Sequence, residues 1–222
     1  ARSRFDRVYE LDASAYHLVL LCKNETGHKN LIKLCSAGCT EGFYIKPRID
    51  FELLKQHSEG LVCLSACLAG EVQQFLLNDN YEGAKECALK YDALFGRGNY
   101  YLELQDHGIE DQQKINVGLI KLSRDTGIPL VATNDAHYID RSDYQMHDVL
   151  LCIQTGKTLE DEDRMRFTGK EFYVKSGDEM EQLFPYTLEA LENTVRIAEM
   201  CNMDFVFGHY HLPAFQLPEG ET

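Results

Sequence analysis

Short apolar segments alternate with longer amphipathic segments along most of the chain. The short segments are bounded by turn residues, which indicates buried β-strands. The predicted strands cover residues 16–22, 60–65, 99–104, 129–133 and 171–174. The longer segments carry apolar residues at helical spacing, which predicts amphipathic helices. The predicted helices cover residues 27–39, 68–78, 81–95, 111–126, 141–154, 177–183 and 187–202.

Single residues mark the ends of two helices. Asp50 is a suitable N-cap for a further short helix, whose Leu53 and Leu54 would face inward. Gly127 follows the predicted helix 111–126 as a C-cap, the position at which glycine is favoured. These boundaries separate the helices from the strands around them.

The alternation of strands and helices predicts parallel βα units, so the chain is of the α/β class. Strands that are apolar on both sides predict a sheet covered on both faces, either a barrel or a doubly wound sheet. In both architectures the chemistry gathers beyond the carboxyl ends of the strands. The residues that follow each strand are therefore the first candidates for a site.

Composition narrows the class of protein. Of the 222 residues, 44% are hydrophobic and 26% charged, which indicates a globular protein. No apolar run approaches the roughly 20 residues that span a bilayer, and no signal peptide is visible, so we expect a cytoplasmic protein without membrane contact. The chain begins at Ala1 rather than at a methionine, which suggests a fragment. A formal charge of −14 disfavours a free-standing nucleic-acid binder unless metal ions or clustered cations intervene.

Most of the eight cysteines lie within apolar segments, which predicts buried, reduced thiols rather than disulfides. The spacings Cys35-x3-Cys39 and Cys63-x3-Cys67 would suit a structural zinc site, but Cys63 lies inside a predicted strand. The pair His209-Tyr-His211 would also suit a metal, but it follows no strand of the βα series. Both are weak candidates.

Asp135 and His137 follow the predicted strand 129–133. Being two residues apart, they point the same way in an extended segment. A carboxylate and an imidazole there suit zinc or manganese, and they equally suit a general acid–base pair. A capped turn with a packed histidine is the structural alternative.

The segments after other predicted strands offer further candidates. Cys67 lies where a helix is predicted to begin, and a helix N-terminus favours the metal-binding thiolate. His17 stands near the start of its strand, against the carboxyl-end rule, so packing explains it better. Packing is also the simpler explanation of Cys67. Glu103, Asp106 and His107 could share one mouth or form a solvated turn.

Several of these residues belong to segments that resemble a known family. The blocks 16–24, 40–50, 64–71, 101–108 and 133–138 resemble successive blocks of the PHP (polymerase and histidinol phosphatase) domain. The blocks 148–157 and 207–215 are similar to segments typical of bacterial DNA polymerase III alpha subunits. The blocks occur in order along nearly the whole chain.

The resemblance implies a PHP-type distorted (β/α)7 barrel that lacks its N-terminal βα units. Intact members hold up to three ions, often zinc or manganese, with nine ligands. The resemblance makes His17, Cys67, Asp135 and His137 four of these ligands, which reverses the packing interpretation of His17 and Cys67. The other five, a His-x-His pair, an aspartate, a histidine and a glutamate, would precede residue 1.

The resemblance also implies a function. The parent protein would be a replicative DNA polymerase, a nucleotidyltransferase, whose PHP domain is a metal-dependent 3′–5′ exonuclease or phosphoesterase. Its partners would be a DNA primer–template and other holoenzyme subunits, and the fragment alone would be inactive. The alternative is a non-catalytic scaffold that stabilises the polymerase and binds a proofreading subunit. A stand-alone PHP phosphoesterase fits less well.

Two further expectations concern the surface and the tail. The loop with Tyr44, Lys46 and Arg48 could approach nucleic acid, although simple solvation explains it equally well. Residues 1–208 would form the PHP fragment, and the proline-containing segment 209–222 would be a linker toward the polymerase palm.

Overall fold

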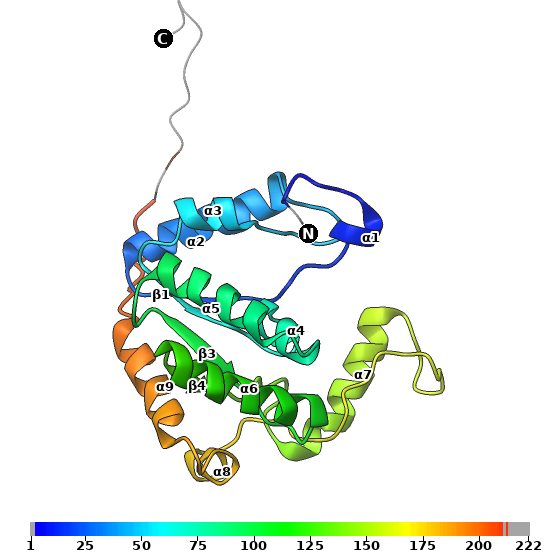
Figure 1. Ribbon diagram of the computed structural model, residues 1–222. Helices are drawn as coiled ribbons and strands as arrows, with labels where there is room; N and C mark the ends of the chain where they lie inside the picture. The colour runs from blue at the N-terminus through cyan, green and yellow to red at the C-terminus, as the bar shows by residue number, and fades with distance from the viewer. Residues whose placement is uncertain (1–2, 211, 213–222) are drawn as a thin grey trace, which may run out of the picture.

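The computed structural model describes residues 3–210 and residue 212. In this part of the chain, four strands form one sheet between layers of helices (Figure 1). The strand order is β1 (Val19–Cys22), β2 (Leu61–Leu64), β3 (Tyr100–Leu104) and β4 (Leu130–Ala132). The strands β2, β3 and β4 are parallel, whereas β1 is antiparallel to β2. The α/β class is confirmed, but the prediction of parallel units throughout is wrong for the first strand.

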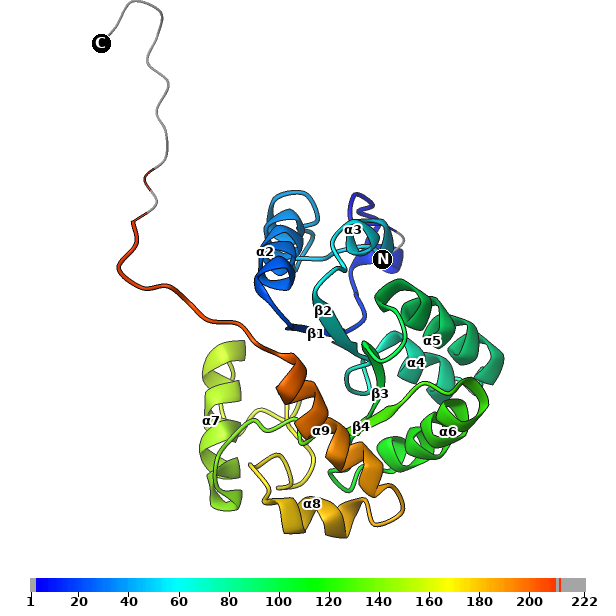
Figure 2. The same cartoon turned by 90° about the vertical axis from the view of Figure 1, so that its left-hand side faces the viewer.

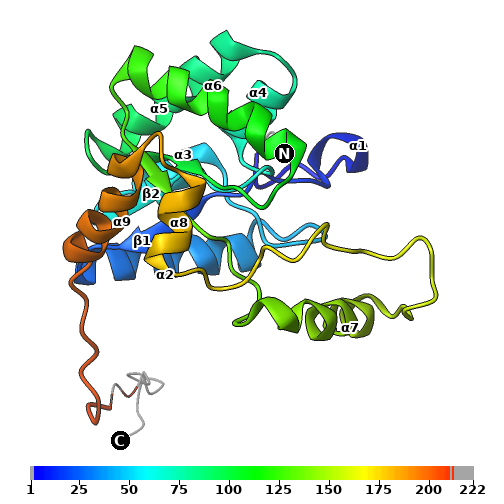
Figure 3. The same ribbon diagram turned by 90° about the horizontal axis from the view of Figure 1, so that it is seen from below.

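The helices connect the strands and cover both sides of the sheet. They are α1 (Tyr9–Asp12), α2 (Glu25–Thr40), α3 (Phe51–Gln56), α4 (Glu71–Leu77), α5 (Tyr81–Phe95), α6 (Glu110–Thr126), the 3₁₀ helix η1 (Arg141–Asp143), α7 (Tyr144–Thr155), α8 (Gly177–Leu183) and α9 (Leu188–Met200). Figure 2 shows α4, α5 and α6 on one side of β3 and β4, and α9 on the other. Figure 3 shows α7 and the loop after it extending away from the sheet.

Alternating side chains explain this layering. Cys63 and Leu102 belong to the larger apolar cluster, which includes residues of α4, α5 and α6. Val62, Leu64 and Tyr101 belong to a second cluster, which Ile197 of α9 completes. Successive side chains of a strand point to opposite faces, so a strand buried on both faces has to be apolar throughout. The central strand β2 is therefore fixed by packing on both sides.

The predicted caps are present. The Asp50 carboxylate accepts a hydrogen bond from the amide of Leu53 at 3.0 Å, and both Leu53 and Leu54 are buried. Gly127 ends α6 with φ of 74°, the left-handed conformation that favours glycine. The strand predicted at 171–174 is wrong, because only one isolated bridge, Tyr138–Tyr173, forms there.

Backbone contact between two glycines fixes how α2 meets β2. The start of α2 lies against the turn before β2, and a Cβ added to Gly27 would lie 1.9 Å from the carbonyl oxygen of Gly60. Gly60 has φ of 76°, which side-chain-bearing residues rarely adopt. The amide of Lys23, just after β1, donates to the same Gly60 carbonyl at 2.8 Å. These contacts help to hold β1 against β2.

The cysteines are all free, and Cys63, Cys87 and Cys152 are buried, as expected for reduced thiols. Cys35 and Cys39 are exposed on α2, whereas Cys63 is buried within β2. Among the described residues these cysteines and Cys67 form no zinc site. The segment 209–222, including His211, falls mostly outside the described residues. Within the described part of the chain, no helix is both long enough and apolar enough to cross a membrane.

Candidate functional site

The antiparallel direction of β1 explains the position of His17. Val19 pairs with Leu64, so the amino end of β1 lies beside the carboxyl end of β2. The amide of His17 donates to the carbonyl of Ala69 at 3.0 Å, and His17 forms a bridge with Gly70. His17 therefore lies at the same sheet edge as the residues that follow β2, β3 and β4, and its conflict with the carboxyl-end rule disappears.

His17 and Cys67 form a close pair at this edge. The Nδ1 atom of His17 lies 3.4 Å from the Sγ atom of Cys67. Two ligands on one tetrahedral zinc ion, with Zn–S of about 2.3 Å and Zn–N of about 2.1 Å, would lie about 3.6 Å apart. The observed separation therefore suits a shared metal ion.

Asp135 and His137 form a second pair. The Oδ1 atom of Asp135 lies 3.5 Å from the Nε2 atom of His137, close to the roughly 3.4 Å expected for two ligands of one tetrahedral ion. Asp135 lines a cavity of about 540 Å³ together with His17 and Cys67. The ring of His137 lies instead among the aromatic rings of Phe167, at 4.6 Å, and Phe172, at 5.7 Å.

The four predicted ligands therefore gather as two pairs at one edge of the sheet. Each pair has the donor types and the separation that suit zinc. Among the residues that the structure describes, however, no group of three or more His, Cys, Asp or Glu side chains could hold a metal ion together. Neither pair alone is a complete metal site, and their role as metal ligands stays a prediction.

A buried carboxylate, that of Glu103, connects the loops that carry the two pairs. Its Oε2 atom accepts a hydrogen bond from the amide of Ala66 at 3.0 Å, next to Cys67. Its Oε1 atom accepts hydrogen bonds from the hydroxyl of Thr133 and from Gln105. Burial raises the pKa of Glu103 against the lowering effect of these hydrogen bonds. The sequence made Glu103 a candidate site residue but did not predict that it connects these loops, because its hydrogen-bond partners are distant in the chain.

The residues predicted to share a mouth with Glu103 lie elsewhere. His107 is buried, its ring stacks on Phe172 with centroids 4.0 Å apart, and its Nε2 atom lies 2.8 Å from the carbonyl oxygen of Asn134. Asp106 lines a different cavity beside α6. The three side chains do not form one mouth.

The environment of Cys67 differs from the prediction. The helix α4 begins at Glu71, so Cys67 precedes the helix rather than opening it. Burial raises the pKa of the Cys67 thiol, and the nearby carboxylate of Asp135 raises it further. The expected lowering of the Cys67 pKa by a helix N-terminus is therefore wrong.

The loop predicted to approach nucleic acid is only partly exposed. Arg48 is 3% exposed, and its guanidinium lies over the ring of Tyr44 at 5.3 Å. The guanidinium donates to the backbone carbonyls of Arg4, Asp6, Asp12 and Gly42. The prediction is therefore wrong for Arg48, which organises the amino-terminal segment. Lys46 is exposed, and its contact with nucleic acid stays a prediction, as does that of Tyr44.

Comparison with known proteins supports the family resemblance of the sequence. Residues 4–107 match the model of the PHP domain family. Nearly the whole chain is similar to the DNA polymerase III alpha subunit. The chain is 49% identical to the subunit from Treponema pallidum over 217 residues and 44% identical to that from Thermus aquaticus over 230 residues.

These matches cover 97% and 100% of the chain but only 18% and 19% of the two relatives. The alpha subunit from Borreliella burgdorferi is similar to the same extent, with 48% identity over 94% of the chain. The chain thus spans less than a fifth of the length of these relatives. It is homologous to the PHP region of the alpha subunit, as the sequence blocks predicted.

Proposed function

We propose that this chain is the carboxyl-side part of the PHP domain of a replicative DNA polymerase III alpha subunit. In the complete protein it would contribute four ligands to a metal-dependent 3′–5′ exonuclease that acts on the primer end. The observation that carries this proposal is the meeting of two donor pairs, each at the separation of ligands on one ion, at one edge of a PHP sheet.

Each residue at the edge has a proposed role. His17 and Cys67 would hold a metal through Nδ1 and Sγ, and Asp135 and His137 would hold one through Oδ1 and Nε2. A thiolate ligand favours zinc over manganese at the first pair. A divalent ion bound there would supply Lewis-acid chemistry for the hydrolysis of a phosphodiester. The cavity of about 540 Å³ leaves room for a terminal nucleotide.

The rest of the parent protein completes the arrangement. We propose that further βα units close the sheet into a distorted seven-stranded barrel and supply the remaining ligands. Residues 1–208 would belong to this domain, and residues 209–222 would lead toward the polymerase palm. The partners would be a primer–template and other holoenzyme subunits in the bacterial cytoplasm.

A scaffold without catalysis is the second candidate. The absence of any three-ligand group in the described part of the chain favours it. In that case the paired side chains would stabilise the domain, and the domain would support the polymerase and a separate proofreading subunit.

The test uses the complete protein with a 5′-labelled primer on its template, excess Mn²⁺ or Zn²⁺, and no nucleotides. We expect trimming of the primer 3′ end and a loss of about 100-fold or more in Asp135→Ala, since ligand loss disables the metal site. The matched control is Asp204→Ala, which removes an exposed carboxylate after α9. No trimming, or equal trimming in both variants, would contradict the proposed exonuclease activity and favour the non-catalytic scaffold.

A further inference from the structure

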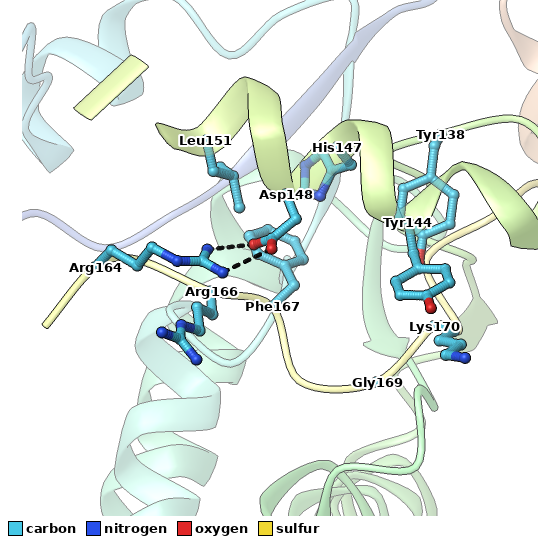
Figure 4. Close-up of a pocket in the computed structure, with 10 residues that line it drawn as sticks. All are labelled: Tyr138, Tyr144, His147, Asp148, Leu151, Arg164, Arg166, Phe167, Gly169 and Lys170. Atoms are coloured by element: carbon cyan, nitrogen blue, oxygen red, sulfur yellow. Dashed lines mark hydrogen bonds and ion pairs between the residues drawn. The ribbon is translucent and has the colours of Figure 1, made fainter. Parts of the chain in front are cut away.

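A second cavity lies between α7 and the loop that follows it, at residues 164–170. It has a volume of about 320 Å³. Figure 4 shows Arg164, Asp148 and Arg166 toward one end of the cavity, and Tyr144 with Lys170 toward the other. Its size falls at the low end of small-molecule sites and suits one nucleotide.

The charge of this cavity is opposite to that of the chain. The chain carries a formal charge of −14, whereas the cavity has three cations and one carboxylate. Arg164 donates to that carboxylate, Asp148, from its Nη1 and Nη2 atoms, and its side chain is only 6% exposed. Arg166 and Lys170 therefore provide a net positive charge in this cavity.

Both of these cations keep donors for a ligand. The Nη2 atom of Arg166 donates to the carbonyl of Asp161 at 3.0 Å, and a guanidinium has five N–H donors. The Nζ atom of Lys170 lies 4.3 Å from the centroid of the Tyr144 ring. Both residues are exposed, so a phosphate can reach them from solvent.

Aromatic rings line the cavity between these cations. Tyr138, Tyr144, His147 and Phe167 all contribute to its wall. Cations that contact phosphate, combined with rings on which a base can stack, form the usual site for single-stranded nucleic acid. A free anion alone would gain nothing from the rings.

The cavity also adjoins the second ligand pair. His137 lies 5.4 Å from His147 and 4.6 Å from Phe167, measured between ring centroids. These two rings therefore separate the cavity from His137. A strand that occupied the cavity would have its neighbouring nucleotide beside the Asp135–His137 pair.

We propose that this cavity binds one nucleotide of single-stranded DNA, with its phosphate on Arg166 and Lys170 and its base among the aromatic rings. The direction of the strand, toward the ligand pairs, rests on the proposed exonuclease. Binding itself needs no metal, so the two proposals can fail separately.

The experiment is a titration of the 222-residue chain with the oligonucleotide (dT)4 at low salt in EDTA. It is followed by amide chemical shifts and by fluorescence anisotropy. We expect shifts concentrated in residues 138–170 and an affinity about 10-fold weaker in Arg166→Gln/Lys170→Gln. The control Lys33→Gln/Lys55→Gln removes the same charge from exposed positions of α2 and α3 and should retain binding. Thermal unfolding checks that all variants are folded.

Several outcomes would overturn the proposal. These are no binding, shifts confined to the edge of the sheet near Cys67, or an equal loss of affinity in the two double variants. Equal affinity for inorganic phosphate and (dT)4 would indicate an anion site and also overturn it. If the cavity binds (dT)4 but the complete protein does not trim a primer, this inference holds and only the proposed exonuclease activity is contradicted.

Discussion

The two ligand pairs occupy the same sheet edge but are held in different ways. The His17–Cys67 pair is tied by main-chain hydrogen bonds, because His17 donates to Ala69 and the amide of Gly70 donates to Cys67 at 2.8 Å. The Asp135–His137 pair lies on a loop where Asp135 has φ of 43°, and the amide of His137 donates to the carbonyl of Phe172 at 2.8 Å. The backbone thus ties the first pair to the segment directly after β2, whereas it ties the second pair to Phe172, whose ring also packs against His137.

The difference identifies which changes should disturb each pair. The packing around His137 comes from residues some 30 positions later in the chain, and this packing can be removed without touching β1 or β2. Glu103 contacts the loops of both pairs, so its replacement should disturb both. The accessibility of the Cys67 thiol reports on the first pair without any bound metal.

Replacing Phe172 by alanine should have the largest effect on stability. The ring is buried and packs against His107, Phe167 and His137. We expect the free energy of unfolding in urea to fall by about 3–4 kcal/mol. The native-state rate of Cys67 alkylation by iodoacetamide should stay unchanged. Phe205→Ala, which removes an exposed ring, is the control and should cost less than about 0.5 kcal/mol. Faster alkylation in folded Phe172→Ala would show that the pairs are not independent.

Replacing Glu103 by glutamine should have an intermediate effect on stability and should affect both pairs. The amide keeps one acceptor oxygen but loses the second, which leaves donors from Ala66, Thr133 or Gln105 unpaired. We expect a loss of about 1–2 kcal/mol, a faster alkylation of Cys67, and shifted resonances of the His137 ring. Glu160→Gln, at an exposed position, serves as the control. An unchanged alkylation rate would mean that Glu103 does not hold the loop of Cys67.

The pH dependence of stability should reveal the buried His107. Burial lowers the pKa of His107, so the folded state disfavours its protonation. Stability from this residue is present above its unfolded pKa and is lost as the pH falls through the folded pKa. Between pH 7 and pH 5 the wild type should lose more stability than His107→Asn in urea titrations. Parallel curves for the two proteins would contradict this assignment.

Replacing Ala66 by glycine should have the smallest effect. Ala66 has φ of 67°, where glycine is favoured, but glycine also gains entropy in the unfolded chain. These contributions oppose each other, so we expect a change within about 0.5 kcal/mol in the free energy of unfolding. Alkylation of Cys67 should rise only slightly, because the hydrogen bond to Glu103 remains. A large rise in the alkylation rate would mean that the side chain of Ala66 holds the loop of Cys67 in place.

The local pattern of the sequence predicted the elements well, because burial on one or both sides determines which residues are apolar. It did not predict the direction of β1, since α2 and α3 can connect two strands in either direction. His17 was misplaced for that reason, and only the family resemblance returned it to the site. The pattern also did not distinguish Arg48 from Arg166. The guanidinium of Arg48 is buried and donates to backbone carbonyls, whereas that of Arg166 lines a cavity and has N–H donors left for a ligand. Both differences depend on contacts between residues far apart in the chain.

The pairing of β1 with β2 limits which insertions and deletions this region can tolerate. Val19 is matched to Leu64, and side chains alternate between the faces of a strand. An extra residue between His17 and Val19 would therefore turn the imidazole to the opposite face of the sheet while leaving composition and core nearly intact. Homologues that keep the pair should show length variation in the loop after α2, and none at Leu18, the single residue that separates His17 from the start of the ladder.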